Sequence, residues 1–168
     1  SLAVAALLGA AVLAAGATYS VYALRSLPQM QGVAHLPGLG APVQVKRDGA
    51  DVTHILAQTP LDAFKTLGMV HAQERAWQLE FNRRVLQGTL SQVLGPATLP
   101  TDKLLRTLGI QRAAERQWQG LPPNAQAALQ AYADGINAFM AQDRQALTPE
   151  FLALGIDPRP AAREGKFW

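Results

Sequence analysis

The three histidines are the residues of this sequence best suited to acid–base chemistry. They are His35, His54 and His71, and the chain contains no cysteine. A catalytic histidine needs a nucleophile and an orienting group placed beside it, and no Ser–Asp set lies near His54 in the sequence. The spacing of the three histidines also fits no metal-ligand pattern. We therefore predict structural roles for His54 and His71, no catalytic residue in this chain, and no metal site.

Ser1 is a second candidate, because the α-amine of an N-terminal serine can act as the base for its own hydroxyl. The ordinary pKa of an α-amine, about 7.7–8.0, suits that task at neutral pH. Ser1 leads directly into an uncharged run rich in Ala, Leu and Val. Such a segment is typical of export signals and not of active sites. We predict that Ser1 is not a nucleophile and that the natural N-terminus lies upstream.

Residues 1–24 have the composition of an export segment. They carry no charge, and Arg25 ends the run. Their length is at the threshold for a membrane span, and Ala15-Gly16-Ala17 offers a cleavage site of the signal-peptidase type. We interpret the segment as a signal peptide or an uncleaved membrane anchor, which places the protein in a bacterial periplasm. An ordinary buried apolar helix is the alternative interpretation.

The rest of the chain divides into a linker and one folded unit. Residues 25–42 contain three prolines and three glycines and few periodic apolar positions, as in a linker. Residues 43–168 can form one domain, since 49% of the 168 residues are hydrophobic. The net charge of +3 comes without a basic run, so we predict no binding of nucleic acid.

The stretch from Thr59 to Gly95 predicts a central helix. Thr59 suits the N-cap and Pro60 the first helical position, while Gly88 interrupts the pattern before Gly95-Pro96 ends it. Apolar residues cover most sides of this helix, which is typical of burial. Its polar residues include His71, Glu74, Arg75, Glu80, Arg83 and Arg84.

Charges on a buried helix must be paired. Glu80 can reach Arg83 or Arg84, which follow it by three and four residues, whereas Arg75 needs a partner elsewhere. We therefore predict a central helix that is enclosed by more protein than this chain supplies.

Shorter elements flank the central helix. Residues 43–46 and 52–57 alternate around a turn signal and predict a β-hairpin. Thr101 is suited to cap a helix that begins at Asp102, and a further helical piece covers residues 111–119. The most amphipathic helix follows Pro123, with apolar residues at Ala125, Leu129, Tyr132, Ile136 and Phe139. In the tail, Thr148-Pro149-Glu150 starts a short helix, Gly155 ends it, and Pro158 and Pro160 predict an extended passage.

Gly135 lies inside the amphipathic helix, where glycine costs about 1 kcal/mol relative to alanine. This cost indicates that another backbone packs closely there. Asp134 and Asn137 flank it and are either pocket residues or polar groups that cap or contact a neighbouring helix; we favour the second role.

Four segments together resemble the α subunit of penicillin acylases. They are VKRDGADVTHILA, GMVHAQERAWQLEFNRR with QGTLSQVLG, LQAYADGINAFM, and PEFLALGIDPRP, and they cover about Val43 to Pro160 in the order that the family has them. One departure is Asp51-Val52-Thr53, where the family usually has Gly-Val-Pro; we expect it to alter a turn only.

The resemblance implies an α+β chain, a mostly helical α subunit with edge strands, within an αββα N-terminal-nucleophile (Ntn) hydrolase heterodimer. It implies hydrolysis of N-acyl amides such as penicillins, cephalosporins or acyl-homoserine lactones by a serine that begins a separate β subunit from the same precursor. It also implies a structural calcium ion in the assembled enzyme and no cofactor for the chemistry. The pocket and calcium residues are expected after Trp168 or on the β subunit. A non-catalytic, membrane-anchored helical scaffold is the alternative.

Overall fold

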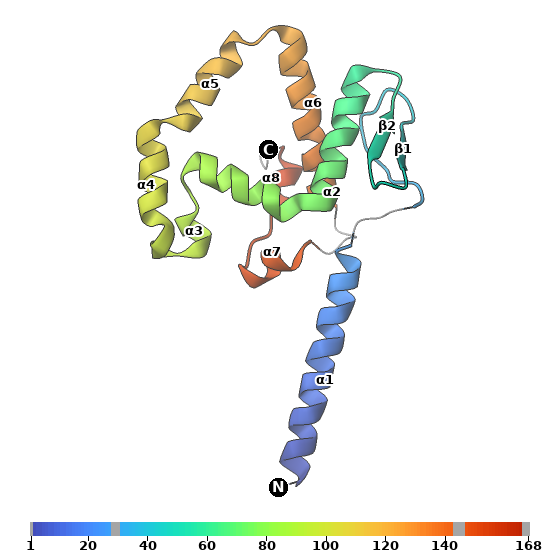
Figure 1. The fold of residues 1–168 in the computed structure, drawn as a ribbon, viewed down its shortest axis with the longest axis vertical. Coiled ribbons are helices and arrows are strands. Elements are labelled where there is room, and N and C mark those ends of the chain that lie inside the picture. Colours follow the sequence, from blue (N-terminus) through green and yellow to red (C-terminus); the bar gives the residue numbers. More distant parts are fainter. Residues whose placement is uncertain (1, 28–30, 143–146, 166–168) are drawn as a thin grey trace.

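The chain is mostly helical and carries one two-stranded sheet, as Figure 1 shows. The computed structural model describes residues 2–27, 31–142 and 147–165, so Ser1 and Trp168 lie outside the described residues. The elements are α1 (Leu2–Arg25), β1 (Gln44–Arg47), β2 (Thr53–Leu56), α2 (Pro60–Gln87), α3 (Ser91–Leu94), the 3-10 helix η1 (Pro96–Thr98), α4 (Leu99–Leu108), α5 (Ile110–Gly120), α6 (Pro123–Met140), α7 (Pro149–Ala153) and α8 (Arg159–Arg163). This architecture confirms the predicted α+β class.

Helix α1 extends away from the rest of the chain (Figure 1). Residues Ala6–Arg25 have a mean hydropathy of 1.6, and none of this segment is buried against other parts of the protein. The helix is therefore long and apolar enough to cross a membrane, a criterion that signal sequences meet as well. The alternative of an ordinary buried helix finds no support within the described residues.

The predicted hairpin is present. Strands β1 and β2 are antiparallel, and Val45 is opposite Ile55. In the turn, the Asp48 carboxylate accepts hydrogen bonds from the backbone N–H groups of Ala50 (2.9 Å) and Val52 (3.0 Å). Asp51 has a φ of 61°, a left-handed conformation that Asp tolerates better than most residues. In the unusual Asp51-Val52-Thr53 segment, Asp51 and Val52 thus lie in the turn, and Thr53 still pairs with Arg47 at the start of β2.

Helix α2 begins where the sequence predicts but ends at Gln87, before the predicted end at Gly95-Pro96, because Gly88 ends it outright. The Thr59 hydroxyl accepts a hydrogen bond from the Asp62 N–H (3.1 Å), and Gly88 ends the helix in the left-handed conformation with a φ of 61°. The linker contributes as well, because the Asp62 carboxylate accepts a hydrogen bond from the Gly40 N–H (2.9 Å) and Leu36 is buried. The bend inside α2 is not predicted: Arg75 has φ −144° and ψ 40°.

Helices α2 and α6 lie side by side (Figure 1) and meet backbone to backbone at two glycines. A Cβ atom added at Gly135 would lie 1.9 Å from the Lys65 carbonyl oxygen, and one at Gly68 would lie 2.0 Å from the Tyr132 carbonyl oxygen. The prediction of a close approach at Gly135 is confirmed. The core continues from this contact into the C-terminal segment and consists of Ala72, Ala76, Leu79, Ile136, Met140, Leu147, Phe151 and Ala162.

Two predictions about element boundaries are wrong. Helix α4 begins at Leu99 and not after Thr101, because the Asp102 side chain is buried and bonds to the preceding helix instead of marking a helix start. Pro158 and Pro160 do not impose an extended passage, since α8 runs over Arg159–Arg163. Pro160 occupies the first turn of α8, where a missing N–H costs no helical hydrogen bond.

We predict that Gly135→Ala destabilises the protein strongly, although alanine is the better helix former. The added methyl group has to push α2 and α6 apart, and such overpacking costs about 1–3 kcal/mol or more. Thermal unfolding of the protein made from its entire gene, followed by circular dichroism, measures the effect. Gly120→Ala is the matched control, because nothing lies within 4 Å of the corresponding Cβ position. Equal melting temperatures for the two variants would contradict the close contact.

Candidate functional site

The structure does not bring the three histidines together. His35 lies exposed in the linker segment. His54 lies on the hairpin, where its Nε2 is 2.9 Å from the Asp48 carboxylate and its side chain is about half exposed. His71 lies on α2. Among the described residues, no group of three or more His, Cys, Asp or Glu side chains is placed to hold a metal ion.

His71 forms a polar pair with Tyr132 across the contact between α2 and α6. Its Nδ1 is 2.9 Å from the Tyr132 hydroxyl, and the two rings meet edge to face. Burial and then the nearby Arg75 charge lower the pKa of His71, while burial raises the pKa of Tyr132. Both groups are therefore neutral near pH 7. Tyr132 is an unactivated phenol, and the geometry is that of a structural hydrogen bond.

The bend of α2 lies between charged groups. Glu74 pairs with Arg47 of β1 and, at 3.8 Å, with the adjacent Arg75. The Arg75 side chain is about half exposed in this chain, and the expectation that a second polypeptide buries and pairs it stays a prediction. The disruption of the helix at Arg75 moves its side chain toward solvent, and the Arg47–Glu74 pair ties the hairpin to α2 directly before the bend.

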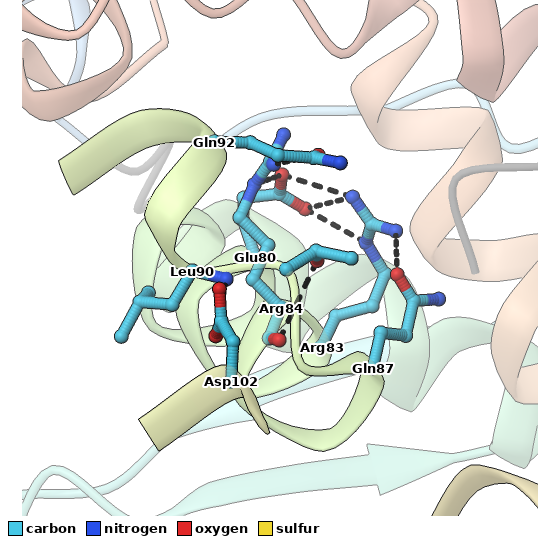
Figure 2. Close-up of polar contacts among 8 residues, drawn as sticks. Glu80, Arg83, Arg84, Gln87, Leu90, Gln92 and Asp102 are labelled. Atoms are coloured by element: carbon cyan, nitrogen blue, oxygen red, sulfur yellow. Dashed lines mark hydrogen bonds and ion pairs between the residues drawn. The ribbon is translucent and has the colours of Figure 1, made fainter. Parts of the chain in front are cut away.

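A buried ionic cluster follows the bend, as Figure 2 shows. The Glu80 side chain is 1% exposed and pairs with both Arg83 and Arg84, with nitrogen–oxygen distances of 2.7 Å and 2.5 Å. Arg83 also donates to the Gln87 side chain (2.9 Å), and Arg84 donates to Gln92 (3.3 Å). The predicted pairing of Glu80 is confirmed for both arginines. Because both carboxylate oxygens are occupied, Glu80 is unavailable as a general base.

Asp102 is a second buried carboxylate beside this cluster (Figure 2). It accepts hydrogen bonds from the backbone N–H groups of Leu90 (2.9 Å) and Ser91 (2.8 Å), at the start of α3. Burial raises the pKa of Asp102, but the hydrogen bonds from Ser91 and Leu90 lower it by more, so the carboxyl stays ionised. The sequence contains no local signal for this cap, since Asp102 follows Leu90 by 12 residues and Ser91 by 11 residues.

Asp134 and Asn137 lie on α6. Asp134 accepts a hydrogen bond from the Gln130 side chain one turn earlier (2.9 Å), and Asn137 is buried. Neither side chain is joined to a histidine or an arginine by a described contact. Their assignment to a neighbouring-helix role stays a prediction.

The prediction that this chain holds no catalytic residue stays a prediction, and the described contacts of its histidines and buried carboxylates bear on it. No serine or threonine hydroxyl is hydrogen-bonded to His54 or His71 in the described part of the chain, whereas a serine triad requires that contact. Three carboxylates are buried in the described part of the chain. Glu80 pairs with two arginines, Asp102 accepts from two backbone N–H groups, and Asp62 accepts from the Gly40 N–H and the Thr59 hydroxyl.

Comparison with known proteins connects this arrangement to a family. The sequence model of the family described as penicillin amidase matches residues 42–166. The chain belongs to the penicillin amidase family. This match confirms the resemblance that the four segments indicate in the sequence.

Individual relatives of the family carry two kinds of name. Penicillin acylase 2 proenzyme from Pseudomonas sp. (strain SE83) is 40% identical over 135 residues, which are 80% of this chain and 17% of that protein. The acyl-homoserine lactone acylase QuiP from Pseudomonas aeruginosa is 34% identical over 133 residues, which are 79% of this chain and 16% of that protein. This chain therefore spans about one sixth of the length of these relatives.

The fold agrees with a solved structure of the family. The thermostable penicillin G acylase from Alcaligenes faecalis superposes with a TM-score of 0.64 at 28% sequence identity. The superposition covers 76% of this chain and 70% of the matched chain. The fold of this penicillin amidase family member is thus that of a large part of one acylase chain.

We predict that Glu80→Gln destabilises the protein by about 3–5 kcal/mol, because it removes the buried charge that Glu80 presents to Arg83 and Arg84. Chemical denaturation followed by tryptophan fluorescence measures the loss. Glu115→Gln is the control, since Glu115 is an exposed residue of α5 whose carboxylate accepts a hydrogen bond from the neutral Gln111 side chain. A Glu80→Gln variant as stable as the control would show that the cluster is hydrated and not buried.

We predict that His71 makes stability depend on pH. Because the pKa of His71 in the folded state lies below its ordinary value of 6.5, the unfolded state binds the proton more tightly. The contribution of His71 to the unfolding free energy is complete above the unfolded pKa and is lost as the pH falls below about 6.5. His71→Gln should flatten the decline between pH 7 and pH 5 in denaturant titrations. His54→Gln on the exposed hairpin is the control, and an unchanged slope in His71→Gln would refute the prediction.

Proposed function

We propose that this chain is the α-subunit part of an N-acyl amide hydrolase of the penicillin acylase type, which is active only together with a β subunit made from the same precursor. The observation that carries the proposal is the family match over residues 42–166, joined to a fold that covers 70% of a penicillin G acylase chain. The names of the relatives point to two substrate classes, β-lactams such as penicillin G and acyl-homoserine lactones. Both are amides with an acyl side chain, and the proposal extends to either.

In the proposed mechanism a serine at the N-terminus of the β subunit attacks the carbonyl carbon of the amide. Its own α-amine takes the hydroxyl proton and passes it to the nitrogen of the leaving group. Backbone N–H and asparagine donors stabilise the oxyanion. Water then attacks the acyl ester, releases the carboxylic acid and restores the serine. This chain would hold the nucleophile's surroundings in place, which agrees with its occupied carboxylates and its unactivated Tyr132.

The exposed apolar surface supports a large partner chain. Leu104 and Leu108 on α4 are 58% and 64% exposed, and Leu61, Phe64 and Leu86 on α2 are also exposed. Large apolar side chains that are exposed in this chain would lose contact with water if a second polypeptide covered them. The central helix α2 has the features of an element that is covered on one side by α6 and on others by a second polypeptide.

The N-terminal helix supports export. α1 fits a signal sequence or a membrane anchor by its length and hydropathy, and we propose a periplasmic enzyme that contacts a membrane only through α1. The proposed reaction needs no cofactor. We propose that the ligands of a structural calcium ion lie after Trp168 or on the β subunit.

The alternative is a non-catalytic, membrane-anchored helical scaffold, which the exposed helix α1 alone favours. The two functions differ in what the gene encodes after this chain and in how the product is processed. A serine-initiated second chain favours the acylase, whereas an intact single chain without such a partner favours the scaffold.

We predict that residues 25–168 made alone aggregate or form a molten globule that binds hydrophobic dyes, because their exposed apolar surface and unpaired strand edges lack the partner. They should release no acid from penicillin G or an acyl-homoserine lactone. Production of the entire precursor should yield two co-purifying chains and restore hydrolysis. Replacement of the first serine of the second chain by alanine should abolish both hydrolysis and processing. An active and cooperatively melting isolated chain would disprove the α-subunit proposal.

A further inference from the structure

A groove of about 240 Å³ lies between the segment of residues 31–39, strand β1 and helix α2. Its floor is buried and apolar, and its rim is exposed. The floor includes Leu36, Met69 and Val70, which are buried. The rim includes Val33, which is 96% exposed, and Val45. Exposed valines above a buried apolar floor make this groove a surface that favours contact with another apolar group.

The groove also contains a polar side chain, Thr66, that needs a hydrogen-bond partner. This residue of α2 is 3% exposed and lines the groove, and its hydroxyl has no hydrogen-bond partner in the described part of the chain. A buried hydroxyl without a partner costs about 1–3 kcal/mol. Arg47 at the end of the groove does not supply the partner, because it pairs with Glu74. The groove therefore favours an occupant that brings an apolar group together with a hydrogen-bonding group.

We infer that this groove receives an extended segment of the second chain of the precursor, with an apolar side chain on the floor and a backbone carbonyl that accepts a hydrogen bond from Thr66. Its volume is below the 300–1,000 Å³ that is usual for small-molecule sites and suits an anchoring side chain. The relatives are about six times longer than the matched segment, so most of such a protein is available as the occupant. The inference rests on the proposed two-chain enzyme and names one of its contacts.

The test uses the co-purified two-chain protein. Val33→Arg places a charge on the rim and should weaken the association of the two chains about tenfold or more in urea-dependent dissociation followed by size-exclusion chromatography. Since Val33 is almost fully exposed, the fold of this chain should not change. Val33→Leu is the matched control and should associate like the natural protein. Equal dissociation of the two variants would overturn the inference.

Substitutions of Thr66 provide a second, independent test of the groove. Thr66→Val removes the hydroxyl at nearly constant volume and should weaken association, whereas Thr66→Ser keeps the hydroxyl and should weaken it less. A photo-crosslinking phenylalanine derivative at position 33 should attach to a single segment of the second chain, identified by mass spectrometry. Crosslinks within this chain only, or a small molecule retained in native mass spectra and lost in Val33→Arg with unchanged chain association, would overturn the inference. Failure of any second chain to co-purify with the natural sequence would instead disprove the proposed function.

Discussion

The contact between α2 and α6 is the constraint on which the rest of the structure depends. Two glycines, Gly68 and Gly135, let the two backbones touch. A Cβ atom at either position would collide with a carbonyl oxygen of the opposite helix. Glycine inside a helix costs conformational entropy, so the two positions are stabilised by the packing that they permit. The buried core beside them, from Ala72 to Phe151, extends this contact into the C-terminal segment.

The bend at Arg75 divides α2 into two parts with different tasks. The part before the bend is bonded to the hairpin through the Arg47–Glu74 ion pair. It is also bonded to α6 through the hydrogen bond between His71 and Tyr132. The part after the bend carries the Glu80 cluster, and Asp102 of α4 caps the helix that follows it. One helix thereby joins the sheet, the helical pair and the α3–α4 arm into a single unit (Figure 1).

Local signals in the sequence account for much of this fold. The Thr59 cap, the Gly88 stop, the hairpin and the pairing of Glu80 follow from signals inside one helix or around one turn. The bend at Arg75 and the Asp102 cap do not, because each depends on contacts between elements that the sequence leaves unpaired. The proposed catalytic serine is not predictable in detail for a simpler reason: in the proposed enzyme it belongs to another segment, so only the resemblance to a family indicates it.

The order of these contacts along the chain has a consequence for synthesis on the ribosome. The Glu80 cluster and the Asp102 cap are nearly complete once residue 102 has emerged, since their partners are close in sequence. The contact between α2 and α6 cannot form until Gly135 has been synthesised. The core is complete only after Phe151 and Ala162 have been synthesised. Contacts between residues far apart in sequence form slowly, and apolar surface stays open during that interval. A chaperone that recognises exposed apolar surface would therefore act on the nascent chain before Phe151 and Ala162 have emerged.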